Sequence, residues 1–129
     1  MILSISTKDE NISIALYQKN ILEKEVIWES YRTQSRELLP EIDRLLKEKN
    51  VKLKDIEYIV VSRGPGSFTG LRVGIAVANS LAKSLNIPVF GVKGEESALS
   101  NAKTVDKKTS KKKITKFNKI VIPFYDSEL

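Results

Sequence analysis

The chain has 129 residues, of which 41% are hydrophobic, and a formal net charge of +6. This length allows one ordinary domain and leaves no room for a second full domain. Cysteine and histidine are both absent, which excludes disulfides, thiolate metal sites and histidine-based acid–base catalysis. No apolar run approaches the length of about 20 residues that spans a bilayer, and the N-terminus lacks a basic leader, so we expect a cytoplasmic protein with no membrane partner.

The first 50 residues predict three strands and a helix. Ile2 to Ser6 is short and apolar, residues 11–17 alternate between apolar and polar, and residues 21–28 continue the pattern as a third antiparallel strand. From Ser35 the apolar residues recur at the spacing of an amphipathic helix that ends near Asn50. Pro40 lies early in this helix, so we expect a shifted start or a slight kink.

Two further strands and a second helix follow. Ile56 to Ser62 is apolar on both faces, as a central parallel strand requires. A helix is predicted over residues 69–86 and another buried strand over residues 88–92. The order β-β-β-α-β-α-β predicts an α/β fold with a mixed five-stranded sheet, the half-domain architecture of ribonuclease-H-like and actin-like folds.

The positive charge is concentrated at the C-terminus. Residues 1–102 contain 14 Lys and Arg against 13 Asp and Glu, whereas residues 103–129 contain 8 against 3. A third helix over residues 95–102 is predicted to be short, and we expect one domain over residues 1–102 and an unstructured Lys-rich linker over residues 103–119. The lysines of this segment could neutralise RNA phosphates without reading sequence, and a solvated linker is the alternative interpretation.

The joint between the fourth strand and the second helix is controlled by glycine and proline. Gly64 and Gly66 flank Pro65, a combination typical of a tight turn, and Ser67 and Thr69 are candidate N-caps for the helix. Such a turn can hold an anion. However, the segment matches neither the Walker loop GxxxxGK[ST] nor the dinucleotide fingerprint GxGxxG.

This joint closely resembles the GPGSFTGLR signature of the TsaB/YeaZ family, which runs without a break through Gly64, Pro65, Gly66, Ser67, Phe68, Thr69, Gly70, Leu71 and Arg72. Two other segments are similar to family motifs. Ser35 with residues 38–40 resembles HSxxLLP, with Gln34 where histidine is common, and residues 2–16 resemble the opening strand pair. The resemblance covers most of residues 1–100, the first of two domains in a usual family member. Residues 120–129 resemble the beginning of the first strand of the second domain.

The resemblance implies a fold similar to that of the actin, hexokinase and Hsp70 ATPases. It also implies a non-catalytic subunit of threonylcarbamoyladenosine synthesis on tRNA, which supports the catalytic paralogue TsaD together with the ATPase TsaE. ATP and a metal ion are then expected on the partner subunits, with no cofactor, metal or catalytic residue on this chain. Ser6 stands where the family usually has aspartate, so an acidic metal anchor is missing and a single half-domain does not close a nucleotide cleft.

The second helix carries a stripe of small residues that would let another backbone approach closely. With neighbouring apolar residues of both helices, it forms the predicted partner interface for TsaD or a second copy: Leu38, Leu39, Ile42, Gly70, Leu71, Gly74, Ile75, Ala78 and Ala82. The alternative is close packing of this stripe on the chain's own sheet.

Arg63 and Arg72 bracket the joint and could hold a phosphate or a partner carboxylate, or be solvated. tRNA is expected to contact the chain only indirectly or weakly. Two other function classes remain: an actin-like ATPase or glycoprotease-like enzyme, which the missing histidine and cysteine disfavour, and a truncated, vestigial family member.

Overall fold

The computed structural model describes residues 1–7, 10–30, 33–65, 68–93 and 97–109. Five strands form one mixed sheet: β1 (Ile2–Ser6), β2 (Asn11–Gln18), β3 (Leu22–Glu29), β4 (Tyr58–Gly64) and β5 (Val89–Lys93). The helices are α1 (Gln34–Glu48), α2 (Phe68–Leu85) and α3 (Ala98–Thr109), and a single 3-10 turn, η1 (Leu53–Asp55), precedes β4. Within these residues no helix combines the length and apolar character that crossing a membrane would require.

The sheet has the strand order β3-β2-β1-β4-β5. β2 pairs antiparallel with both β1 and β3, while β4 pairs parallel with both β1 and β5. This arrangement confirms the predicted three-stranded meander followed by two helical crossovers. The α/β, ribonuclease-H-like half-domain is therefore the fold of the described residues.

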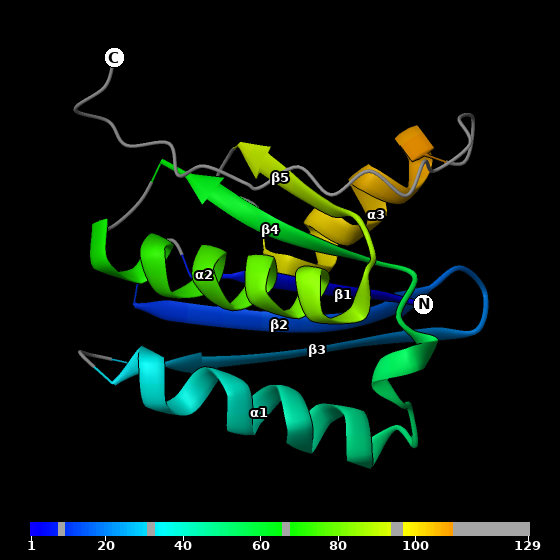
Figure 1. Cartoon of the computed structure of the whole chain (residues 1–129), viewed down its shortest axis with the longest axis horizontal. Helices are drawn as coiled ribbons and strands as arrows, with labels where there is room; N and C mark the ends of the chain where they lie inside the picture. Colours follow the sequence, from blue (N-terminus) through cyan, green and yellow to red (C-terminus); the bar gives the residue numbers. More distant parts are fainter. Residues whose placement is uncertain (8–9, 31–32, 66–67, 94–96, 110–129) are drawn as a thin grey trace.

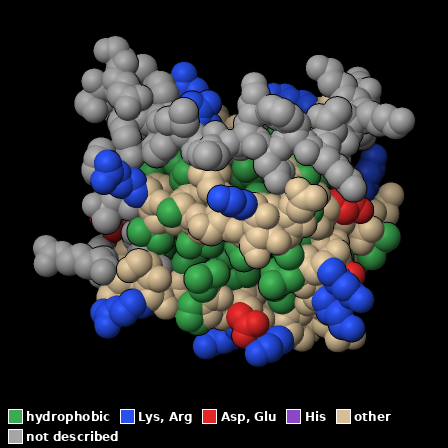
Figure 2. Space-filling view, viewed as in Figure 1, with side chains coloured by type: hydrophobic (Ala, Val, Ile, Leu, Met, Phe, Trp, Pro, Cys, Tyr) green, Lys and Arg blue, Asp and Glu red, His purple; other side chains and the backbone are tan. Residues whose placement is uncertain are grey.

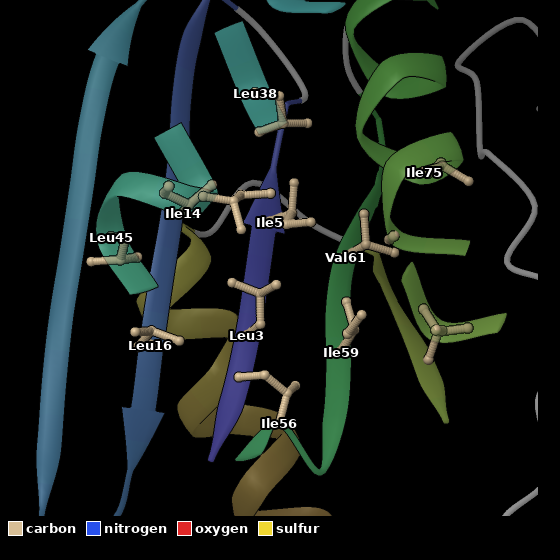
Figure 3. Packing of buried hydrophobic residues seen from close by; sticks show 14 of the residues in the cluster. Leu3, Ile5, Ile14, Leu16, Leu38, Leu45, Ile56, Ile59, Val61 and Ile75 are labelled. Atoms are coloured by element: carbon tan, nitrogen blue, oxygen red, sulfur yellow. The ribbon is translucent and has the colours of Figure 1, made fainter. Parts of the chain in front are cut away.

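The three helices cover opposite faces of the sheet: α1 and α2 lie on one face and α3 on the other (Figure 1). The main core fills the space between the sheet and the first two helices (Figure 3). There Leu3 and Ile5 of β1 and Ile59 and Val61 of β4 pack with Leu38 of α1, all fully buried. A smaller cluster lies under α3 and contains Ile2, Tyr58, Val60, Ala102 and Val105. The central strands are buried on both sides, as their continuous apolar runs predict.

α1 and α2 end in the same way, on an asparagine in the left-handed conformation. Asn50 has φ 54° and Asn86 has φ 55°. In the residue after each asparagine, the backbone N–H donates to a carbonyl five positions earlier, Val51 to Leu46 at 2.9 Å and Ile87 to Ala82 at 3.0 Å. This is the bonding of a Schellman-type helix end, which satisfies carbonyls that the last turn would leave unpaired.

Pro40 lies inside α1, which begins at Gln34, one residue before the predicted start. A proline at this position removes one backbone donor, and the carbonyl of the exposed Arg36 is the acceptor that loses its partner. Because that turn faces solvent, water can satisfy the carbonyl, and the helix continues through the proline.

α3 corrects the prediction for the C-terminal part of the domain. The helix begins at Ala98 and continues to Thr109, so the predicted boundary between residues 102 and 103 falls inside it. Val105 is buried against the sheet, and Lys103 forms a 2.7 Å ion pair with Glu23 of β3. Residues 103–109 therefore belong to the domain and are not a linker. The rest of the predicted linker and residues 120–129 lie outside the described residues.

Candidate functional site

The joint that carries the family signature connects the carboxyl end of β4 to the first turn of α2. Gly64 has φ 100°, a region that side-chain-bearing residues rarely adopt, and its peptide bond to Pro65 is cis. Its backbone N–H donates to Ser62 Oγ at 3.4 Å, and the pairing of β4 with β5 shifts register between these two residues. The glycine is thus required where the strand turns out of the sheet.

The predicted capping residues of the joint are only partly placed. Gly66 and Ser67 lie outside the described residues. α2 begins at Phe68, so Thr69 is already helical and does not occupy the N-cap position that we expected.

Thr7, directly after β1, connects this joint to the sheet by a hydrogen bond. Its hydroxyl Oγ1 donates to the carbonyl of Gly70 at 2.6 Å in a fully buried contact. A Cβ atom on Gly74 would overlap Thr7 Oγ1 and would lie 3.1 Å from Thr7 Cγ2. Gly70 and Gly74 of the signature helix therefore face β1, and sequence analysis missed the threonine between them.

The small-residue stripe consequently faces inward, and its prediction as an interface is corrected. Gly70, Gly74, Ala78 and Ala82 are all buried within the chain. Of the nine predicted interface residues, eight are buried and only Leu39 is exposed, at 49%. Close packing on the chain's own sheet, the alternative interpretation, is what the structure shows for this stripe. The buried members are Leu38, Ile42, Gly70, Leu71, Gly74, Ile75, Ala78 and Ala82.

Other apolar side chains form the outer surface of the two helices. Besides Leu39 of α1, they are Val73, Val77 and Leu81 of α2, which are half-buried and touch the edge of the main core. Figure 2 shows hydrophobic side chains gathered along these helices, with charged groups around them. We call Leu39, Val73, Val77 and Leu81 the helical face. In the sequence, Val73, Val77 and Leu81 recur at i, i+4 and i+8, which indicates one side of a helix. The small-residue stripe has the same spacing, so this signal does not distinguish the two.

The two arginines of the joint are displayed differently. Arg63, on β4, is half-buried, and Arg72 is exposed at the beginning of the second turn of α2. Each already interacts with other groups of the chain. Whether either also holds an anion stays a prediction.

The position usually occupied by the family's aspartate is buried and neutral. Ser6 is 1% exposed at the end of β1, and its partner across the β1–β2 ladder is Ser13. Within the described residues, no three carboxylate side chains lie close enough together to hold a metal ion. The expectation that this chain holds no cofactor stays a prediction.

A carboxylate at the start of α1 is held by neighbouring hydroxyls. Ser30 Oγ donates to Glu37 Oε1, and the Thr33 hydroxyl lies 3.1 Å from Ser30 Oγ. The hydrogen bond from Ser30 lowers the pKa of Glu37 below its ordinary value of 4.5, with a smaller effect from Thr33 in the same direction. These hydrogen bonds join Ser30, directly after β3, to the first turn of α1.

Comparison with known proteins identifies the family. Residues 28–112 match the family model of TsaD, tRNA N6-adenosine threonylcarbamoyltransferase. The tRNA threonylcarbamoyladenosine biosynthesis protein TsaB of Buchnera aphidicola subsp. Schizaphis graminum is 37% identical over 92 residues, 71% of this chain and 43% of that protein. TsaB of Bacillus subtilis is 34% identical over 105 residues, 81% of this chain and 46% of that protein.

Among solved structures, YeaZ from Pseudomonas aeruginosa superimposes with a TM-score of 0.68 at 35% identity, covering 71% of this chain and 43% of that one. The chain spans less than half the length of these relatives. The described fold is shared with the YeaZ structure. The chain belongs to the TsaB/YeaZ family, and the part of it that matches the TsaD family model includes the joint around Gly64.

Proposed function

We propose that this chain is a non-catalytic subunit in threonylcarbamoyladenosine biosynthesis on tRNA, next to the anticodon. Its role is to bind and support a catalytic TsaD paralogue, together with TsaE. The names of its relatives support the pathway, and the exposed apolar surface of α1 and α2 supports a role in binding another protein.

The helical face is the observation that supports the partner. Leu39 is exposed, and Val73, Val77 and Leu81 are half-buried on α2, beside the stripe of small residues that packs on the chain's own sheet. Two adjacent helices with apolar outer residues can pair with two helices of a homologous subunit, which removes this surface from water. A TsaD paralogue is the proposed occupant, and a second copy of this chain is the competing one.

ATP and metal chemistry belong, in this proposal, to the partner subunits. The half-domain presents one sheet with the neutral Ser6 at the position of the usual aspartate and the neutral Ser13 opposite it on β2. The chain then contributes binding surface and no reacting group. The pure chain should release no phosphate from ATP above background, and titration calorimetry with Mg²⁺ should show no tight site.

Co-expression with the TsaD paralogue of the same cell, followed by size-exclusion chromatography with light scattering, tests the interface. The double variant Leu39→Glu/Ala76→Glu places charge on Leu39, the exposed member of the helical face, and on Ala76, an exposed position of α2 that borders this face next to Val77. It should lose co-elution, because desolvating two carboxylates at an apolar interface is unfavourable.

Leu53→Glu is the matched control, since Leu53 is also an exposed apolar residue, at 41%, but lies on η1 outside the helical face. It should retain co-elution. Retained co-elution of the double variant, with circular dichroism showing a folded chain, would remove the helical face as the binding surface. A homodimer that persists in the presence of TsaD would favour the second copy as occupant.

A further inference from the structure

Three segments distant in sequence meet at the end of the sheet opposite the signature joint. They are the β2–β3 turn around residues 18–22, the connection from α1 to β4 over residues 49–57, and the last turn of α3. A hollow of about 530 Å³ between the first two is lined by Ile21, Asn50 and Glu57 among others. The third is placed by Asp106, whose Oδ1 accepts from the hydroxyl of Tyr58, the first residue of β4, at 3.5 Å.

Six lysines lie on these three segments, and we call them the basic end: Lys19, Lys49, Lys52, Lys54, Lys107 and Lys108. All are exposed except Lys49, which is half-buried. The connection and the last turn of α3 are far apart in the chain, so no single stretch of sequence shows this concentration. A lysine surface assembled from separate segments is the form that a binding site for a bulky polyanion takes.

The acidic side chains on the same segments serve contacts inside the fold. Glu57 lies 3.4 Å from the N-terminal ammonium of Met1, and Asp55 accepts from the backbone N–H of Lys52 at 2.9 Å. Asp106 accepts from Tyr58. Three carboxylates thus stand against six lysines, and Glu57 is already paired with a cation of the chain, while Asp55 and Asp106 accept hydrogen bonds from neutral groups.

Favourable interaction with helix dipoles explains only part of this pattern. Lysines are commonly found at helix C-termini, which carry partial negative charge, and Lys107, Lys108 and Lys49 are at such ends. Lys19 lies in a strand turn, and Lys52 and Lys54 lie in or beside η1. These three need a different explanation. In the sequence, moreover, five more lysines follow α3 directly, at positions 111, 112, 113, 116 and 119.

We propose that the basic end binds the phosphate backbone of RNA, on the side of the molecule opposite the joint and apart from the helical face. The choice of RNA rests on the proposed function, which brings the chain next to tRNA. Lysine ammonium groups are strongly hydrated point charges, so they contact phosphates without reading bases. Binding is therefore independent of sequence and weakens steeply with salt, because each neutralised phosphate releases counterions.

The test is fluorescence anisotropy of the full chain with a labelled, unmodified tRNA transcript at several KCl concentrations. The basic-end variant is Lys52→Gln/Lys54→Gln/Lys108→Gln. The matched control, Arg36→Gln/Arg44→Gln/Lys93→Gln, removes the same charge from exposed positions outside the basic end. The basic-end variant should weaken binding roughly tenfold or more near 0.1 M salt and reduce the slope of log K against log salt by about 2 to 3. The control should change both far less.

Equal weakening by both variants would mean that only net charge acts, and this would overturn the proposal. So would a loss of binding confined to Lys111→Gln/Lys112→Gln/Lys113→Gln with the basic-end variant unchanged. Sedimentation with phosphatidylserine vesicles is the third arm, and binding to vesicles but not to RNA would assign the surface to membranes instead. Co-elution with TsaD should be unaffected by the basic-end variant, which separates this proposal from the proposed function.

Discussion

Thr7 occupies the space into which a side chain on Gly74 would project. The threonine follows β1, the glycine lies in the second turn of α2, and Thr7 Oγ1 donates at 2.6 Å to Gly70, one turn before Gly74. The hydroxyl can reach that carbonyl only because no Cβ stands in the way. Gly70 and Gly74 of α2 are therefore explained by their contacts with Thr7, and no second protein is needed to explain them.

Gly74→Ala should destabilise the chain by about 1–3 kcal/mol, because its methyl group collides with Thr7 and either the helix or the strand end must shift. Urea unfolding followed by circular dichroism measures the change. In the double variant Thr7→Ala/Gly74→Ala the colliding atoms are gone, so the two substitutions should cost less together than the sum of their separate effects.

Additive costs would show that the two residues do not interact. The control is Ser80→Ala, which changes an exposed position of the same helix and should be almost neutral. Ala76→Gly/Ala78→Gly is not a suitable control, because it adds backbone freedom. A larger side chain at this position would collide with Thr7 more severely than the methyl group of alanine. A leucine there would disrupt the fold before it could report on any partner.

The periodicity of the sequence was sufficient to predict the sheet and the first two helices, because apolar residues repeat every second position in residues 11–17 and along one stripe after Ser35. Periodicity could not determine which face of α2 packs on the sheet. Leucine, isoleucine, valine and alanine make up half of that helix, and a small residue is compatible either with a close sheet or with a close partner. The deciding contact comes from Thr7, more than 60 residues away.

The sequence underestimates how far α3 extends for a similar reason. Its own sequence is rich in lysine, and its apolar positions at helical spacing are held by the small Ala98, Ala102 and Val105, so the local pattern is weak and favours a linker. Its stability comes from elsewhere in the chain: Ser13 Oγ accepts from the N–H of Ala98 at 2.9 Å, and Glu25 accepts from that of Leu99 at 2.7 Å. Strand side chains thus cap this helix, and capping across such sequence distances leaves no local signal.

Ser13→Ala should loosen α3. The substitution leaves the buried N–H of Ala98 without its acceptor, at a cost of about 1–2 kcal/mol in the free energy of unfolding. Hydrogen exchange should accelerate for the amides of residues 98–101 more than for those of β4. Ser80→Ala again controls for the loss of a hydroxyl, and uniform acceleration across the domain would argue against a local cap.

The Ser30–Glu37 contact predicts that the stability of the fold depends on pH in the acidic range. The folded-state pKa of Glu37 lies below its ordinary 4.5, so its contribution to stability is complete above about pH 4.5 and is lost as the pH falls through the lower, folded-state value. Ser30→Ala should raise the pKa of Glu37, measured by carboxyl carbon NMR titration. The stability difference between the parent and this variant should be smaller at pH 3 than at pH 7, and a constant difference would contradict the ionic contribution.

The two asparagines that end α1 and α2 predict opposite effects for two substitutions at one position. Asn86 has φ 55°, where an alanine side chain approaches the following carbonyl, so Asn86→Ala should lower stability by about 1 kcal/mol. Asn86→Gly should be neutral or slightly stabilising, because glycine adopts this conformation without strain. The same pair of substitutions at Asn50, where φ is 54°, repeats the test at the end of α1.

Asn11 is the internal control. It is exposed in β2, whose extended backbone disfavours glycine, so there glycine should cost more than alanine. Thermal unfolding of the six variants measures this reversal. If alanine and glycine ranked the same way at all three positions, the left-handed helix ends would not be what selects asparagine at residues 50 and 86.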